Sequence, residues 1–93
     1  MRKVIIIGAG AQANVITGVL SRADDVSEIL VTDIDLARAQ ELAEVNGSAK
    51  VKAEKIDASD IDGMAKRIKQ GDFDLVVNAT LPRFVHNVMK AGF

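Results

Sequence analysis

The chain contains no cysteine, no tryptophan and no tyrosine, and it has one proline and one histidine among its 93 residues. The lack of cysteine excludes disulfides, a thiol nucleophile and a thiolate metal site, and a single histidine excludes a metal site built from several histidines. No apolar run approaches the roughly 18 residues of a spanning helix, and no signal-peptide pattern precedes the first strand. These absences predict a cytoplasmic protein without a membrane partner.

The sequence also lacks an excess of either positive or negative charge. Twelve Lys and Arg residues oppose 13 Asp and Glu residues, which leaves a formal net charge of −1. The basic residues are scattered, so the sequence lacks the electrostatic footprint of a nucleic-acid-binding protein. A hydrophobic share of 48% and a charged share of 27% are typical of a globular protein. We therefore expect one small domain, residues 1–93, with no nucleic-acid partner.

Strand-like and helix-like segments alternate four times along the chain, which is the order that builds parallel βαβ units. The pattern predicts an α/β fold of the Rossmann type, a partial doubly wound parallel sheet in the order 3-2-1-4 with helices on both faces. Apolar runs predict strands at residues 3–7, 28–32, 50–56 and 73–78, and helical periodicity predicts helices at residues 11–21, 36–46 and 60–70 and after residue 80.

Local signals refine these elements. Asp35 is a plausible helix N-cap with Gly47 as the stop, and Ser59 or Asp60 caps the next helix, which Gly71 ends. The second helix is expected to bury Leu36, Ala39, Leu42 and Ala43. Gly18 inside the first helix predicts a close approach to the sheet. The third strand alternates charged and apolar residues like an edge strand, and the fourth has the composition of a buried strand.

A complete dinucleotide fold adds two strands beyond the fourth. We therefore expect the chain to be the N-terminal part of a longer polypeptide, or a segment cut from one. The fourth strand then becomes an open edge, which favours pairing with a second copy as a homodimer.

The most informative motif is G-x-G-x-x-A, which directly follows the apolar run Val4–Ile7. Gly8 supplies a tight turn, and Gly10 leaves no Cβ where the backbone meets a pyrophosphate. The next residues, Ala11 and Gln12, open a helix whose free N–H groups favour an anion, and Ala13 lets that helix lie close to its strand. The alternative is a plain strand-turn-helix junction without a ligand.

An acidic residue ends the second strand at the spacing that this motif requires. Asp33 lies 23 residues after Gly10, close to the roughly 20 residues at which a carboxylate accepts from the adenosine ribose. Ile34 belongs to the same cofactor-binding set. Asp33 and Asp35 repel a 2′-phosphate. No Arg or Lys directly follows Asp33 to offset this repulsion, since Arg38 lies a turn into the helix, so NAD is favoured over NADP. Alternatively, both aspartates are only helix-entry residues.

Two further segments fall where this fold touches a dinucleotide. Asp57 and Ala58 follow the third strand at the place of the adenine ring, although capping explains them equally well. The fourth strand leads into Asn78, Ala79 and Thr80, beside the nicotinamide ribose and the pyrophosphate. Their alternatives are a turn residue and an N-cap.

No catalytic residue and no metal site are assigned within this chain. The one histidine, His86, falls inside the last expected helix and has no neighbouring nucleophile in the pattern. We interpret it as an ordinary helix residue rather than a general base.

These motifs, together with Val31-Thr32-Asp33, the segment from Ile56 to Asp60 and the segment from Asp74 to Pro82, resemble the N-terminal nucleotide-binding domain of the saccharopine dehydrogenase superfamily. The resemblance covers essentially the whole chain. It implies an NAD(P)-dependent oxidoreductase of amino-acid metabolism that acts on a carbon–nitrogen bond, with catalytic and amino-acid-binding residues in a later domain. We expect nucleotide binding and no turnover from these 93 residues alone.

Two other hypotheses remain at this point. One is a regulatory nucleotide-sensing domain of a potassium channel or transporter, which also begins with an apolar strand, G-x-G and an acid after the second strand. The other is a truncated scaffold with the same fold and no ligand.

Overall fold

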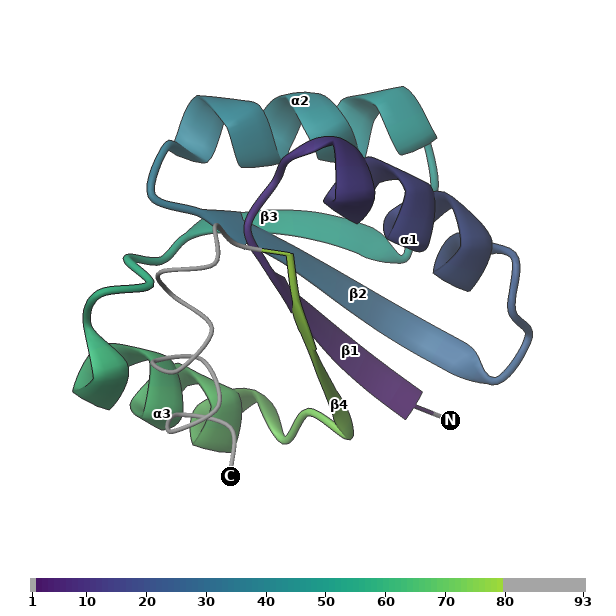
Figure 1. Cartoon of the computed structure of the whole chain (residues 1–93). Helices are drawn as coiled ribbons and strands as arrows, with labels where there is room; N and C mark the ends of the chain where they lie inside the picture. The colour runs from purple at the N-terminus through teal and green to yellow at the C-terminus, as the bar shows by residue number, and fades with distance from the viewer. Residues whose placement is uncertain (1, 80–93) are drawn as a thin grey trace.

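The computed structural model describes residues 2–79 as a parallel four-stranded sheet with helices on both faces (Figure 1). Its strands follow the order β3-β2-β1-β4, as predicted. The expected last helix, with Thr80, Pro82 and His86, lies outside the described residues. In chain order the elements are β1 (Arg2–Ile7), α1 (Ala11–Ser21), β2 (Val26–Asp33), α2 (Leu36–Asn46), β3 (Val51–Lys55), α3 (Ile61–Gly71) and β4 (Leu75–Asn78).

The inner strand β1 is largely buried because it has a neighbour on each side and helices on both faces. It pairs in parallel with β2 and with β4, and Val4 to Ile7 are at most 1% exposed. Alternate residues enter different cores. Val4 and Ile6 belong to the cluster beneath α1 and α2, whereas Ile5 and Ile7 pack with Met64 of α3.

The helices cover the sheet as a doubly wound order requires. Helices α1 and α2 lie next to each other over one face, and α3 covers the other face (Figure 1). Ala13 of α1 and Ala39 of α2 are fully buried against the first face, and the small size of both side chains lets the helices approach the strands. None of the helices in residues 2–79 is long and apolar enough to cross a membrane.

The helix ends follow the predicted signals with one correction, at the end of α3. The Asp35 carboxylate caps α2 by accepting from the Ala37 N–H at 3.0 Å, and Gly47 ends that helix with a φ of 63°. Of the two predicted caps of α3, Asp60 is the one observed, and its carboxylate accepts from the Gly63 N–H. Gly71 is still helical, and the left-handed position falls on Asp72, with a φ of 52°.

Three expectations about packing were wrong. Gly18 faces α2 rather than the sheet, because a Cβ built on it would meet the Asn46 side chain at 3.6 Å. Leu36 is exposed, since it lies in the first turn of α2 beyond the edge of the core. Strand β4 begins only at Leu75, which is 48% exposed because β4 has a strand neighbour on one side only among residues 2–79.

Candidate functional site

All predicted site residues within the described range lie at one edge of the sheet. Because the four strands are parallel, their carboxyl ends meet at this edge, which is where ligands bind in open α/β sheets. The register sets Ile7 between Thr32 and Asn78. The glycine motif, the end of β2 and the end of β4 are thereby brought together, with the loop after β3 beyond β2.

The glycine loop after β1 has one glycine that the backbone needs and one that it does not. Gly8 has a φ of 100°, a conformation that L side chains rarely adopt, and its N–H donates to the Thr32 carbonyl oxygen at 2.8 Å. Gly10 has a φ of −86°, and a Cβ built on it would meet nothing within 4 Å. Gly10 therefore leaves an open space beside the start of α1.

Helix α1 differs from α2 and α3 in having no side-chain cap. Gly10 occupies the N-cap position, where it provides no hydrogen bond, and no acidic residue lies in the first turn. The first N–H groups of a helix have no partner within it, and together with the helix dipole they favour an anion. Gln12 is exposed at this end, whereas Ala13 is buried against the sheet. The arrangement fits a phosphate group.

The Asp33 carboxylate joins the glycine loop to the beginning of the next crossover. Its Oδ2 accepts from the Ala9 N–H at 2.9 Å, and its Oδ1 accepts from the Asp35 N–H at 2.9 Å. Asp35 is a helix-entry residue, as the alternative interpretation held, but Asp33 has a different function in the fold. A carboxylate has about four lone-pair positions, so both oxygens of Asp33 retain the capacity to accept from a hydroxyl. The neighbouring Ile34 is exposed at this edge.

The loop after β3 is a local turn around Asp57. Its Oδ1 accepts from the Ser59 hydroxyl at 2.7 Å and from the Ser59 N–H at 2.9 Å. The Ser59 hydroxyl and N–H, followed by the charge of Lys55, hold the pKa of Asp57 below its ordinary value. Ala58 packs against the core beneath α3. These bonds match the capping interpretation of this stretch, and the adenine contact stays a prediction.

The end of β4 is held against the glycine loop. Asn78 is the register partner of Ile7, and the Ala79 N–H donates to the Ile7 carbonyl oxygen at 2.9 Å. Both residues are half-buried and lie beside Gly8. This position is compatible with the predicted contact with the nicotinamide ribose and the pyrophosphate. Thr80, the third residue of this predicted set, lies outside the described residues.

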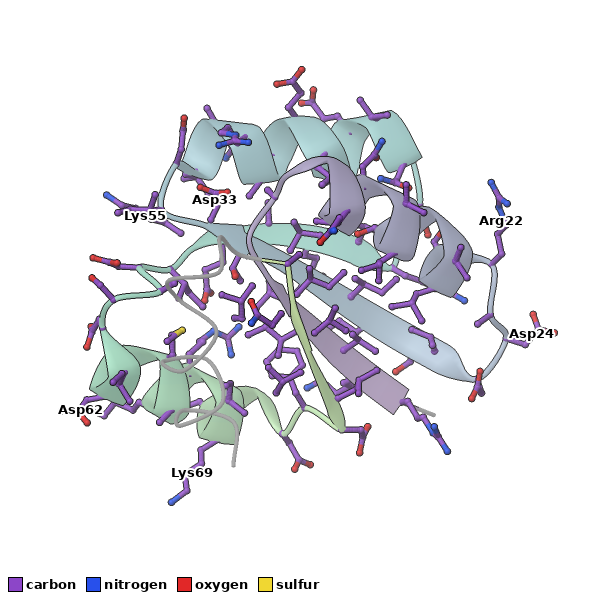
Figure 2. All side chains as sticks on the ribbon, viewed as in Figure 1. Arg22, Asp24, Asp33, Lys55, Asp62 and Lys69 are labelled. Carbon is purple, nitrogen blue, oxygen red and sulfur yellow. The ribbon has the colours of Figure 1, made fainter. Side chains whose placement is uncertain are left out.

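One charged residue at this edge was not predicted. Lys55, the last residue of β3, is the register partner of Asp33 and is exposed. Figure 2 shows the two side chains near each other at the edge where α2 begins, whereas Arg22 and Asp24 lie at the opposite end of the sheet. The signal that identifies Lys55 is the strand order, because β3 was expected beside β2.

A groove of about 300 Å³ opens between the end of β3 and α3. Lys55, Asp57 and the ion pair between Arg67 and Glu54, with an N···O distance of 2.6 Å, line it. The glycine loop is not part of this lining, so the groove is separate from the predicted pyrophosphate position.

Three dehydrogenases are similar to this chain in sequence or structure. Carboxyaminopropylagmatine dehydrogenase from Synechocystis is 32% identical over 82 residues, which cover 88% of this chain and 21% of that protein. Apo saccharopine dehydrogenase (L-Glu forming) from Saccharomyces cerevisiae has a TM-score of 0.82 and 30% identity, over 99% of this chain and 19% of that one. Quinate dehydrogenase from Corynebacterium glutamicum, solved in complex with NAD, has a TM-score of 0.69 and 30% identity, over 89% of this chain and 29% of that one.

The chain thus spans about a fifth of the length of the first two dehydrogenases, and the region that they share with it is this Rossmann-like unit. These matches support the dehydrogenase hypothesis and not the channel-domain alternative. The family model for the saccharopine dehydrogenase NADP binding domain matches residues 4–92. The chain belongs to the family of saccharopine dehydrogenase NAD(P)-binding domains.

Proposed function

We propose that this chain holds NAD, with NADP as the weaker ligand, for an amino-acid oxidoreductase that transfers hydride at a carbon–nitrogen bond. The observation that carries the proposal is the bond from the Ala9 N–H to the Asp33 carboxylate at 2.9 Å. It fixes an acceptor for ribose hydroxyls next to the uncapped start of α1, which suits a phosphate. A sugar acceptor beside an anion position is the combination that a dinucleotide requires.

In this proposal the site residues bind different parts of the dinucleotide. Gly8 and Gly10 shape the loop that meets the pyrophosphate, and the N–H groups of Ala11, Gln12 and Ala13 face its charge. Asp33 accepts from the adenosine ribose, with Ile34 beside it. Asp57 and Ala58 border the adenine, and Asn78, Ala79 and Thr80 border the nicotinamide ribose. When bound, the nicotinamide ring supplies the hydride chemistry, and the protein supplies binding and orientation.

Charge favours NAD over NADP. A 2′-phosphate would add about two negative charges beside the carboxylates of Asp33 and Asp35. Arg38 is exposed in the first turn of α2 and opposes them only in part. The repulsion lowers the affinity for NADP relative to NAD.

The substrate class rests on the family resemblance rather than on this domain. The names of two similar proteins refer to saccharopine and carboxyaminopropylagmatine, whereas the third is a quinate dehydrogenase. Quinate is not an amino acid, so one nucleotide-binding unit accompanies different substrates. We accordingly place substrate binding and catalysis outside these 93 residues and expect no turnover from them alone.

Calorimetric titration of the folded chain with NADH and with NADPH tests the proposal. The expected result is heat of binding and a change in nicotinamide fluorescence with both, with the tighter binding for NADH. Titration with adenosine serves as the control that separates binding of the pyrophosphate and the nicotinamide half from binding of the adenosine half alone. A sample with a cooperative thermal transition that binds neither dinucleotide would contradict the proposal.

We also propose that the outer edge of β4 pairs with a second copy of the chain. Within residues 2–79, β4 has β1 as its only strand neighbour, and the side chain of Leu75 is 48% exposed there. Lysine side chains on an edge strand oppose such pairing. Sedimentation equilibrium should therefore show self-association that Leu75→Lys weakens, and an unchanged monomer at all concentrations would contradict this interface.

A further inference from the structure

The position of Lys55 sets it beside the predicted ribose acceptor. Lys55 ends β3, Asp33 ends β2, and the two are paired in the parallel register of these strands. Neighbouring strands lie about 4.8 Å apart, which is less than the length of an extended lysine side chain. The ammonium group can therefore reach the region around the Asp33 carboxylate.

Both side chains also occupy the same face of the sheet. Val31 and Ala53, two residues earlier in each strand, belong to the core beneath α1 and α2. Because side chains alternate along a strand, Asp33 and Lys55 are on this face as well. Lys52 has the opposite parity, and its register partner Leu30 belongs to the core beneath α3.

The charge of Lys55 is not neutralised by an ion pair within residues 2–79. The pairs of this region include Lys52 with Glu28 and Arg67 with Glu54, but none with Lys55. Its charge still acts on this edge, since it contributes to the lowered pKa of Asp57. Lys55 is thus an exposed cation between the two acidic loops that border the predicted adenosine site.

We propose that Lys55 is a second determinant of nucleotide specificity, whose ammonium group binds the 2′-phosphate of NADP beside Asp33. The proposal rests on the proposed function of this site. Asp33 and Asp35 oppose the extra phosphate, and Lys55 offsets part of that repulsion, so the domain accepts both dinucleotides while it prefers NAD. The other function of an exposed lysine on an edge strand is to prevent pairing between sheets.

Removal of the charge in Lys55→Met separates these two functions. The methionine keeps the length of the side chain, and Lys52→Met is the matched control on the same strand and the opposite face. We expect Lys55→Met to lower the affinity for NADPH about fivefold, as expected for one partly screened charge near a phosphate. The affinity for NADH should stay within about twofold, because NADH lacks the 2′-phosphate. Lys52→Met should change neither.

Salt supplies a second readout that a structural function would not change. Raising the salt concentration should weaken NADPH binding to the wild type more than NADH binding, and Lys55→Met should reduce that difference. Equal effects of Lys55→Met on both dinucleotides, or none on either, would overturn the proposal. So would a wild-type chain that binds NADH and shows no affinity for NADPH. A wild type that binds neither refutes the proposed function instead.

Discussion

Asp33 and Asp57 both follow strands at the same edge of the sheet, but their carboxylates are used differently. Asp33 accepts from the N–H of Ala9, which lies 24 residues away in the sequence. Asp57 accepts from Ser59, only two residues away. The carboxylate of Asp33 therefore depends on the assembled sheet and holds the glycine loop, whereas that of Asp57 shapes only its own turn. Loss of the Asp33 carboxylate should therefore disturb the glycine loop as well, whereas loss of the Asp57 carboxylate should disturb its own turn.

Asp33→Ala gives the largest expected effect. It removes the acceptor of two backbone N–H groups and should lower the free energy of unfolding by about 1–3 kcal/mol. The affinity for NADH should fall about tenfold or more, because the ribose acceptor is lost and the loop is released. Chemical denaturation and calorimetric titration measure the two quantities.

Asp35→Ala is the matched control for this comparison. It removes the cap of α2 and should cost about 1 kcal/mol of stability, but it leaves the bond between Asp33 and Ala9 in place. NADH affinity should then stay close to that of the wild type. If both variants weaken NADH binding equally, the loss reflects general destabilisation, and the special position of Asp33 is refuted.

The two glycines of the loop sharpen the distinction between a structural and a binding function. Gly8→Ala should cost about 1–2 kcal/mol of stability, since alanine is strained at a φ of 100°. Gly10→Ala should cost about 0.5 kcal/mol, because its Cβ enters open space and only the N-cap preference changes.

The effects on NADH affinity should have the opposite order. Gly10→Ala should weaken NADH binding more than Gly8→Ala does, because the added methyl group at Gly10 stands in the path of the pyrophosphate. Thermal denaturation and NADH titration of both variants test this pair. Unimpaired NADH binding by Gly10→Ala would show that the pyrophosphate does not approach at this position.

Asp57→Ala should lower the affinity for NADH less than Asp33→Ala or Gly10→Ala does. The carboxylate is exposed, and within residues 2–79 its hydrogen bonds come from Ser59 of its own turn, so NADH affinity should fall no more than about threefold, as for one exposed hydrogen bond. A loss as large as that of Asp33→Ala would mean that the adenine contact matters as much as the glycine loop.

Ser59→Ala tests the local character of this turn by titration. Removal of the hydroxyl eliminates the main cause of the lowered pKa, so the pKa of Asp57 should rise toward its ordinary value. A folded-state pKa below the unfolded value contributes stability above the unfolded pKa, and this contribution is lost as the pH falls through the folded pKa. NMR titration of the Asp57 carboxyl carbon measures the change, and an unaltered pKa would contradict the assignment to Ser59.

The sequence predicted the fold well where burial controls the pattern. The run Val4–Ile7 and the small residues Ala13 and Ala39 are nearly or fully buried, so their types are restricted by packing. Strand ends were less predictable because they depend on pairing. Strand β2 begins at Val26, opposite Arg2, rather than at residue 28, and β4 begins at Leu75 rather than at residue 73.

At the candidate site, the sequence indicated which residues reach the edge but not how they bond. The spacing between Gly10 and Asp33 predicted that the carboxylate lies near the loop, yet the bond to Ala9 requires a specific turn after β1. Lys55 was missed because its neighbour Asp33 is 22 residues away, and only the register of two strands brings them together. Bonds within a turn, such as that of Asp57, were anticipated as capping because they need no tertiary structure.

The central place of β1 has a consequence for synthesis of the chain. Its neighbour β4 is far away in the sequence, as the bond from the Lys3 N–H to the Asp74 carboxylate shows across 71 residues. At about 5–20 residues per second, a ribosome needs on the order of 10 s to make that stretch. During this interval the most apolar strand of the nascent chain has a bare edge that chaperones or other strands can bind. Of the strands β1 to β4, the one that leads into the glycine loop is thus synthesised before the others and gains its second neighbour only when β4 has been made.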